Sequence, residues 1–495
     1  MDISREKTGD IPPDQRKSKS FAADVLTLVG GTTFAQLVVL LASPILTRLY
    51  GPEDFGVWAL FISITGIIGV IACLRYEFSI MLPESDEDAI NLLALSLVIV
   101  LMTTIITIPL IYLFKDSLVL ALNSPQLGDY MWLIPPFVLV SGVFLALNYW
   151  NSRTKHFKRL SFAQISSSLS STGTQIGAGV SGYATEIGLI AGSFVGIFVS
   201  TSVLGGQIWK DDNRLFRKYI NVNKMISGLK RHRKFPLIDS WSALLNTISW
   251  QLPAFLLAFF FSPAVVGFYS LGFRLLQMPM NFVGKSLSQV FFQRASIANL
   301  EDNLSSLAEN VFRILVMIGM FPILTVTIVG SDIFSVVFGQ AWTEAGVYAQ
   351  ILSIWAFFWF ISSPLSSIYV VLEKQQFGLK FNVFNFVTRI SSLAIGGYLG
   401  NARIALALFA ATGVLVYGYL SLKMMHYAGV KMSRVAKIVL SNLVIFIPAG
   451  ILLITLKLLE VNQLLIVGVS GLLTAVYYGY IVITDKQLRS RANLL

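Results

Sequence analysis

Four basic side chains lie inside long apolar stretches of this chain, where a charge is unfavourable unless it faces water or a partner. These residues are Arg274, Lys285, Arg313 and Arg389. At 100° per residue, Arg274, Asn281 and Lys285 fall within about 20° of one line along a helix, with Gln277 beside it. Guanidinium, ammonium and amide groups on one face suit an anionic ligand that also accepts hydrogen bonds.

A second stripe combines a cation with amides further along the chain. Asn382, Asn385 and Arg389 share one helical face. The alternative is structural, because buried polar groups also form hydrogen bonds between helices and long basic side chains extend to the membrane surface. That alternative suits Arg313 and Lys285 best, since both lie nearer the ends of their stretches. We therefore expect a water-filled cationic cavity centred on Arg274 and Arg389.

The carboxylates follow a different pattern, because none lies near the centre of a long apolar stretch. Asp24, Glu77, Asp239 and Glu373 lie at ends of such stretches, and Glu77 is close enough in sequence to pair with Arg75. Asp24 and Asp239 each open the first helix of one half of the chain, which makes them the candidates for ion coupling. Cations at the centre and carboxylates at the rim suit an anionic substrate.

The helices that position these residues contain an internal repeat. The stretch Leu49–Leu60 returns 211 residues later as Phe261–Leu271. The matched pairs are Pro52 and Pro263, Gly56 and Gly267, Trp58 and Tyr269, and Leu60 and Leu271. In each copy the proline suits the first turn of a helix. A repeat at one fixed offset in an apolar chain predicts a duplicated helical lobe.

Composition indicates a polytopic all-α membrane protein. The 495 residues are 55% hydrophobic and 13% charged, with mean hydropathy +0.71, and the only cysteine, Cys73, lies in an apolar run. Fourteen stretches have the length that a membrane-spanning helix needs. They cover about 21–49, 53–78, 89–114, 130–151, 160–181, 186–209, 236–261, 263–293, 309–330, 344–372, 377–399, 402–427, 435–458 and 462–484.

The predicted domains follow from these helices. A polar tail (1–20) has no signal-peptide cleavage pattern. It precedes a six-helix N-lobe (21–209), a basic connector (210–235) and a six-helix C-lobe (236–428). Two further helices and a tail occupy 429–495.

Basic residues predict the orientation in the membrane. If the N-terminal tail is cytoplasmic and the sides alternate, 29 Lys and Arg residues lie inside and four lie outside. Both termini should then be cytoplasmic. The net charge of +11 is thus a topology signal that also favours contact with anionic membrane lipids, and no nucleic-acid partner is expected.

Signals of enzymatic chemistry are weak in this chain. Gly284-Lys285-Ser286 lacks the upstream glycine and strand of a phosphate-binding loop. The acidic run Asp86-Glu87-Asp88 fits a solvated loop, and the three histidines lie in basic loops without metal-ligand spacing. We expect no catalytic residue, no metal and no cofactor.

Two segments resemble a known family. Ser43–Leu60 (SPILTRLYGPEDFGVWAL) and Arg75–Ala89 (RYEFSIMLPESDEDA) are similar to the opening of Wzx-type O-antigen and oligosaccharide flippases. These belong to the multidrug/oligosaccharidyl-lipid/polysaccharide exporter (MOP) superfamily. The resemblance implies two six-helix lobes around a central cavity, and a substrate made of an oligosaccharide on undecaprenyl diphosphate.

The same resemblance implies transport from the inner to the outer leaflet of a bacterial cytoplasmic membrane, beside polymerase or glycosyltransferase partners. In the related lipid II flippase, arginines on early helices of each lobe line the cavity. Arg274 fits that pattern, and Arg48 and Arg75 match it more loosely. The last two predicted helices depart from the twelve of many Wzx-type members.

Two other functions remain open from the sequence. A MATE-type multidrug exporter expels cations and would favour carboxylates inside the membrane. A membrane polysaccharide polymerase or ligase would need a sizeable outer segment, whereas the longest predicted outer loops here have only about 13–16 residues.

Overall fold

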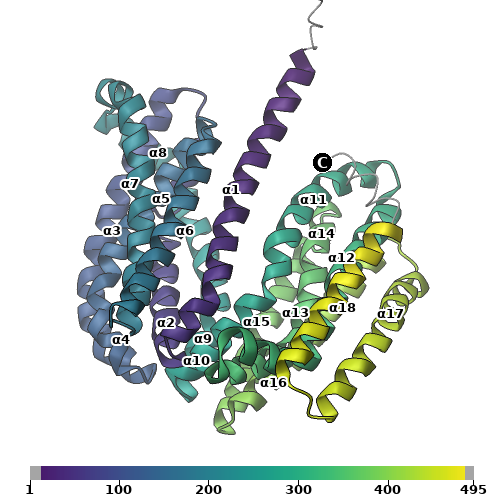
Figure 1. Ribbon diagram of the computed structural model, residues 1–495. Helices are drawn as coiled ribbons and strands as arrows, with labels where there is room; N and C mark the ends of the chain where they lie inside the picture. Colours follow the sequence, from purple (N-terminus) through teal and green to yellow (C-terminus); the bar gives the residue numbers. More distant parts are fainter. Residues whose placement is uncertain (1–12, 485–495) are drawn as a thin grey trace, which may run out of the picture. The chain divides into compact units, whose positions relative to one another are not determined.

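The protein is built from helices throughout the part of the chain that the structure describes. The computed structural model describes residues 13–484, with side chains at 30–284 and 287–484, and this part contains no strand (Figure 1). Ten helical segments are long and apolar enough to cross a membrane. They are Gly30–Leu49, Asp86–Ala121, Pro125–Arg153, Glu186–Tyr219, Phe235–Phe260, Leu304–Phe338, Gln340–Val371, Ala402–Tyr427, Met432–Leu458 and Gln463–Thr484. The predicted class, an all-α polytopic membrane protein, is confirmed.

Helices also occupy the other four stretches that were predicted to span. Two of them, α6 (Phe157–Val180) and α15 (Gln375–Tyr398), are continuous but rich in polar and small residues. The other two are shorter than predicted: α2 covers Pro52–Gly69 and α10 covers Pro263–Leu276. The count of fourteen spans stays a prediction, because ten helices meet the length and hydropathy of a span.

Helix α2 ends earlier than the sequence indicated. After Gly69 the chain turns, and Leu74 and Arg75 adopt left-handed φ angles of 47° and 64°. Residues other than glycine rarely adopt this backbone conformation, and it is incompatible with a right-handed helix. A short 3₁₀ helix, η1 (Tyr76–Met81), follows. Arg75 and Glu77 therefore lie in a compact turn and not on the end of a spanning helix.

The stretch 263–293 is also interrupted, although the sequence predicted one helix there. Helix α10 ends at Leu276, a π-helical turn (η4, Met280–Gly284) follows, and α11 (Lys285–Leu300) continues the chain. Pro279 lacks the N–H that would bond to the preceding turn, and the wider π turn changes the angle per residue. Arg274 and Asn281 therefore do not keep the alignment that a regular helix would give them.

The chain forms two compact units. Among the described residues, unit 1 contains 13–43, 64–115 and 129–248, and unit 2 contains 44–63, 116–128 and 249–484. Helices α1 (Pro13–Leu49), α2, α3 (Asp86–Ala121) and α9 (Ser240–Phe260) each contribute residues to both units. The predicted lobe boundaries remain a prediction.

Unit 1 is a helical bundle with its own apolar core. Its other main helices are α5 (Ile134–Arg153), α6, α7 (Glu186–Tyr219) and α8 (Val222–Arg231). The core includes Tyr76, Ile90 and Trp150, each fully buried, and the indole N–H of Trp150 donates to Asp212 at 2.9 Å. Because η1 supplies Tyr76 and Ile80 to this core, the turn that holds Arg75 and Glu77 is fixed by packing.

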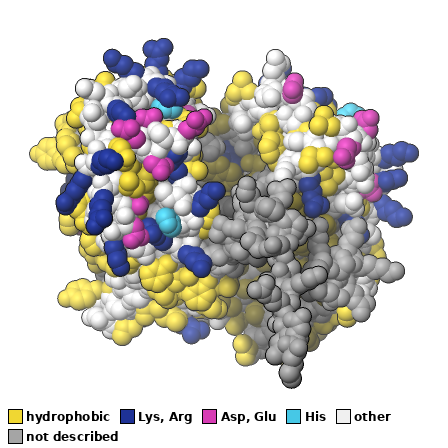
Figure 2. Space-filling view, turned by 90° about the horizontal axis from the view of Figure 1, so that it is seen from above, with side chains coloured by type: hydrophobic (Ala, Val, Ile, Leu, Met, Phe, Trp, Pro, Cys, Tyr) yellow, Lys and Arg dark blue, Asp and Glu magenta, His cyan; other side chains and the backbone are white. Residues whose placement is uncertain are grey.

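Basic residues cover one end of unit 1. Residues 210–235, predicted as a connector, contain the end of α7, all of α8 and the start of a π turn (η3, Phe235–Asp239). Eight of their Lys and Arg side chains are exposed, namely Lys210, Arg214, Arg217, Lys218, Lys230, Arg231, Arg233 and Lys234. Figure 2 shows Lys and Arg side chains gathered on the face where α8 lies. The sidedness of the membrane stays a prediction.

Unit 2 is built around long helices in its second half. They are α12 (Leu304–Phe338), α13 (Thr343–Leu365), α15, α16 (Ala402–Tyr427), α17 (Met432–Leu458) and α18 (Gln463–Thr484), with α14 (Ser367–Val371) and the first four residues of α4 (Pro125–Tyr130) as short additions. The last two helices pack against α12. Phe321 stacks on Tyr477 with ring centroids 4.3 Å apart, and Lys457 pairs with Asp332 at 2.9 Å.

The two copies of the sequence repeat meet inside unit 2. A Cβ atom added to Gly56 would lie 1.7 Å from the carbonyl oxygen of Pro263. One added to Gly267 would lie 1.9 Å from the carbonyl oxygen of Pro52. Only glycine allows such an approach, so α2 and α10 cross where each glycine meets the proline that opens the other helix. The contact is reciprocal, as expected for two equivalent copies.

Candidate functional site

Helices α2, α9 and α10 line an open cavity of about 460 Å³ within unit 2. Helix α2 contributes Phe55, Trp58, Ala59, Ile62 and Ser63; α9 contributes Trp250, Gln251 and Ala254; and α10 with its C-cap contributes Tyr269, Ser270, Leu271, Phe273, Arg274 and Gln277. The volume lies within the range of small-molecule sites, about 300–1,000 Å³. Because the crossing of α2 and α10 sets its walls, the repeat that forms this crossing also forms the cavity.

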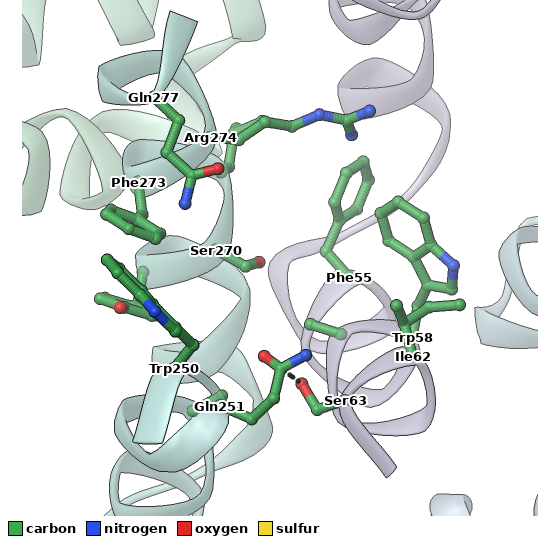
Figure 3. A pocket seen from close by; sticks show the side chains of 14 residues that line it. Phe55, Trp58, Ile62, Ser63, Trp250, Gln251, Ser270, Phe273, Arg274 and Gln277 are labelled. Carbon is green, nitrogen blue, oxygen red and sulfur yellow. Dashed lines mark hydrogen bonds between the residues drawn. The ribbon is translucent and has the colours of Figure 1, made fainter. Parts of the chain in front are cut away.

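Arg274 is the charged residue of this cavity. It lies in the last turn of α10 and is half-buried. Its guanidinium lies over the ring of Trp58, 6.0 Å from the centroid, and Figure 3 shows it extended toward α2 above Phe55. Among the described residues, no hydrogen bond or ion pair to this guanidinium is found. Its donors are therefore available to a ligand.

The remaining lining is aromatic and amide-bearing, and none of the 14 side chains in Figure 3 is acidic. Gln277 lies beside Arg274, and Gln251 and Ser63 are within hydrogen-bond distance of each other, 3.4 Å apart. Rings of Phe55, Trp58, Trp250, Tyr269 and Phe273 supply apolar faces. Such a lining can bind an anion at one end and a neutral, hydroxyl-rich group along the rings.

A stack of aromatic rings forms the wall behind the cavity and ends on Arg389. Trp250 packs on Trp359 with centroids 5.3 Å apart. The Arg389 guanidinium covers Trp250 at 4.4 Å from its centroid and donates to the Tyr417 hydroxyl at 2.9 Å. Arg389 is only 4% exposed and does not line the cavity. Its contacts hold the Trp250 indole in place.

The other predicted residues of unit 2 are dispersed. Asn385 is buried and donates to the same Tyr417 hydroxyl at 3.2 Å. Asn382 and Arg48 are exposed, and Asn281 lies in the π turn without lining the cavity. Two more predictions, Lys285 and Asp24, concern side chains outside the described residues. Of the predicted site residues, Arg274 and Gln277 share the cavity.

Arg75 and Asp239 come together in unit 1, where they form an ion pair at 2.8 Å. Glu77 lies 3.7 Å from the same guanidinium, so the predicted pairing of Arg75 with Glu77 is confirmed. Glu77 is fully buried and its oxygens accept no hydrogen bond from the described residues. Burial raises the pKa of Glu77 to about 7, since its own backbone N–H and the attraction of Arg75 offset only part of the desolvation.

Sequence reasoning missed most of the lining. Trp58, Trp250 and Gln251 were not predicted, although Trp58 matches Tyr269 in the repeat and both line the cavity. Residues at equivalent places of two crossing helices face the same space, so the repeat itself carried this signal. Trp250 had no such signal, because its place depends on packing against Trp359 and Arg389. No group of three His, Cys, Asp or Glu residues that could hold a metal occurs among the described residues.

The fold is shared with solved structures of transporters from the MOP superfamily. The structure of the lipid II flippase MurJ in an inward closed conformation aligns with a TM-score of 0.71 at 12% identity, over 92% of this chain and 98% of that chain. An inward-facing MATE-family multidrug transporter aligns with a TM-score of 0.60 at 14% identity, over 80% of this chain and 94% of that chain. A MOP-superfamily transporter from Pyrococcus furiosus aligns with a TM-score of 0.55 at 14% identity, over 82% of this chain and 95% of that chain.

The family of the protein is shown by the match of its sequence to a family profile. A polysaccharide biosynthesis protein profile matches residues 45–347, which is more than half of the chain, so the protein belongs to that family. Among curated proteins, no sequence matches this one. The predicted resemblance to MOP-type flippases is confirmed, while the Wzx-type assignment stays a prediction.

Proposed function

We propose that this protein flips an oligosaccharide on undecaprenyl diphosphate from the cytoplasmic to the outer leaflet of a bacterial inner membrane. Membership of the polysaccharide biosynthesis family and the fold shared with a lipid II flippase support a lipid-linked sugar as the substrate. The observation that carries the proposal is the half-buried Arg274 guanidinium in a cavity without carboxylates.

In this proposal Arg274 binds the diphosphate. A diphosphate crosses hydrocarbon only when its charge is compensated, since an unpaired ion there is unfavourable by many kcal/mol. A guanidinium offers two parallel donors to phosphate oxygens, and Gln277 and Gln251 supply amides for the first sugar. The prenyl chain stays in lipid, and rocking of the two lobes exposes the site to each side in turn.

A MATE-type cation exporter is the second candidate, because proteins of that type share the fold. A cationic drug would need a carboxylate or an uncharged aromatic site, and this cavity presents a cation instead. The lining thus favours an anionic substrate. A polymerase or ligase is the third candidate, and its prediction from the sequence is weak because the predicted outer loops are short.

The test replaces Arg274 in full-length protein reconstituted in liposomes with a fluorescent undecaprenyl-diphosphate oligosaccharide. Arg274→Ala should slow flipping by about 100-fold or more, because it removes a charge-assisted pair. Arg274→Lys should restore part of the rate, since it keeps the charge without the fork.

The matched control is Arg403→Gln, which removes an exposed arginine of unit 2 that pairs with Glu344 at 2.8 Å. This variant should flip at a wild-type rate. Normal flipping by Arg274→Ala would contradict the proposal. Export of ethidium by the wild-type protein, without movement of the sugar lipid, would favour the cation exporter.

A further inference from the structure

A second cavity of about 520 Å³ lies between α12, α17 and α18, and it shares no residue with the Arg274 cavity. Its lining is Arg313 and Met317 of α12; Ile438, Ser441, Asn442 and Ile445 of α17; and Tyr477, Tyr480, Ile481 and Thr484 of α18. We propose that this cavity binds one anionic glycerophospholipid whose head group carries free hydroxyls, such as phosphatidylglycerol.

The depth of the cavity suits a lipid head group. Arg313 lies nine residues after the start of α12, and Ser441 lies nine residues after the start of α17. Both are therefore about 13–14 Å along the axis from their helix ends. Thr484 is the last residue of α18 that the structure describes. The cavity thus lies toward the beginnings of α12 and α17, where hydrocarbon gives way to head groups.

On α12 and α17 the lining changes from a polar to an apolar side chain over one turn, and Ile438 and Ile481 add apolar groups at the outer level. One turn deeper than Arg313 lies Met317, and one turn deeper than Ser441 lies Ile445. Tyr477 closes the deep side, because its hydroxyl donates to the Met317 carbonyl at 2.7 Å. A phospholipid has the same order, with a charged head above apolar chains.

The polar half offers both donors and acceptors. Arg313 already makes a contact within the protein. A guanidinium has five N–H donors, so the same side chain can also donate to a head group. Tyr480 is 51% exposed, so its hydroxyl can reach a head group. Ser441 and Thr484 donate to carbonyls of their own helices at 3.0 and 2.7 Å, which leaves their oxygens as acceptors for head-group hydroxyls.

Charge around the cavity favours an anion. Lys437 is exposed and lies one turn before Ser441 on the same face of α17. Arg434 lies nearby but pairs with Glu309 at 3.0 Å, so it contributes little net charge. Basic groups between spanning helices bind anionic head groups in this way. The exposed apolar side chains of α17 and α18, such as Val444 and Val476, then contact the acyl chains.

The test measures lipid binding to the full-length protein in detergent by native mass spectrometry. The probes are palmitoyl-oleoyl phosphatidylglycerol, phosphatidylcholine with the same chains, and sodium phosphate. One phosphatidylglycerol should bind about tenfold more tightly than phosphatidylcholine, and Arg313→Gln should remove this preference. Arg313→Lys should keep most of it. Phosphate at 10 mM should not displace the lipid, because the chains contribute to binding.

The control variant is Arg434→Gln, which changes an exposed arginine outside the cavity and should alter the preference less than twofold. Equal losses in Arg313→Gln and Arg434→Gln would indicate diffuse surface attraction and overturn the proposal. Equal affinity for the two lipids, or displacement by free phosphate, would also overturn it. If Arg313→Gln fails to fold, Ile445→Trp fills the apolar half and should expel the lipid with the charge intact.

Discussion

Arg274 and Arg389 are both arginines within predicted membrane-spanning stretches of unit 2, yet they occupy different surroundings. Arg274 lies against one ring, that of Trp58, at the edge of a cavity and has donors available to a ligand. Arg389 is enclosed by Trp250, Tyr417 and the Ser249 carbonyl. The comparison shows that two arginines of apolar helices can differ in their contacts: one has donors available to a ligand, and the other supports an aromatic wall.

The largest effect on stability is expected at Arg389. Arg389→Ala should lower the free energy of unfolding by roughly 3 kcal/mol, because it leaves a void beside Trp250 and removes the donor to Tyr417. Thermal unfolding in detergent measures this loss. Arg274→Ala should change stability by less than about 1 kcal/mol. If the two variants unfold at the same temperature, Arg389 does not support the structure more than Arg274 does, and the distinction drawn between them is wrong.

In unit 1 the buried charged group is a carboxylate, that of Glu77. Because the pKa of Glu77 is raised from 4.5 to about 7, the folded protein holds a proton that the unfolded chain releases between these pH values. The contribution of Glu77 to stability should therefore be complete below about pH 4.5 and should fall by about 1–3 kcal/mol as the pH rises to about 7. Melting temperatures measured from pH 5 to 8 would show this slope.

Two variants identify the source of that slope. Glu77→Gln should remove it, since the amide does not titrate. Glu301→Gln changes an exposed carboxylate and should leave the slope as in the wild type. A slope that persists in Glu77→Gln would mean that the proton is bound elsewhere.

The smallest effect is expected at Trp58, which contacts Arg274 from the opposite wall. Trp58→Leu removes the ring below the guanidinium and should slow flipping by about threefold to tenfold. Trp58→Phe keeps a ring and should lose less. Initial flipping rates in the liposome assay measure both. A rate in Trp58→Leu as low as in Arg274→Ala would show that the ring, and not the charge, dominates the site.

Much of the fold could be predicted because the membrane imposes simple rules on a sequence. Helical length and hydropathy identified the class, and the repeat predicted that the helices opened by Pro52 and Pro263 are equivalent. Their reciprocal glycine contacts agree with that equivalence. The pairing of Arg75 with Glu77 was predicted because two residues in one turn meet in almost any fold.

The site was harder to predict because it depends on where helices stop. Regular periodicity aligned Arg274 with Asn281 and Lys285, but the π turn after Leu276 changes that register. Periodicity also assigned Arg389 and Arg274 to one cavity, because both are polar interruptions of apolar helices. Only the packed structure shows that Tyr417 and Trp250 enclose Arg389. The sequence by itself determined which residues are cations in the membrane; the tertiary structure decided which of them has room for a ligand, because that depends on neighbours distant in the chain.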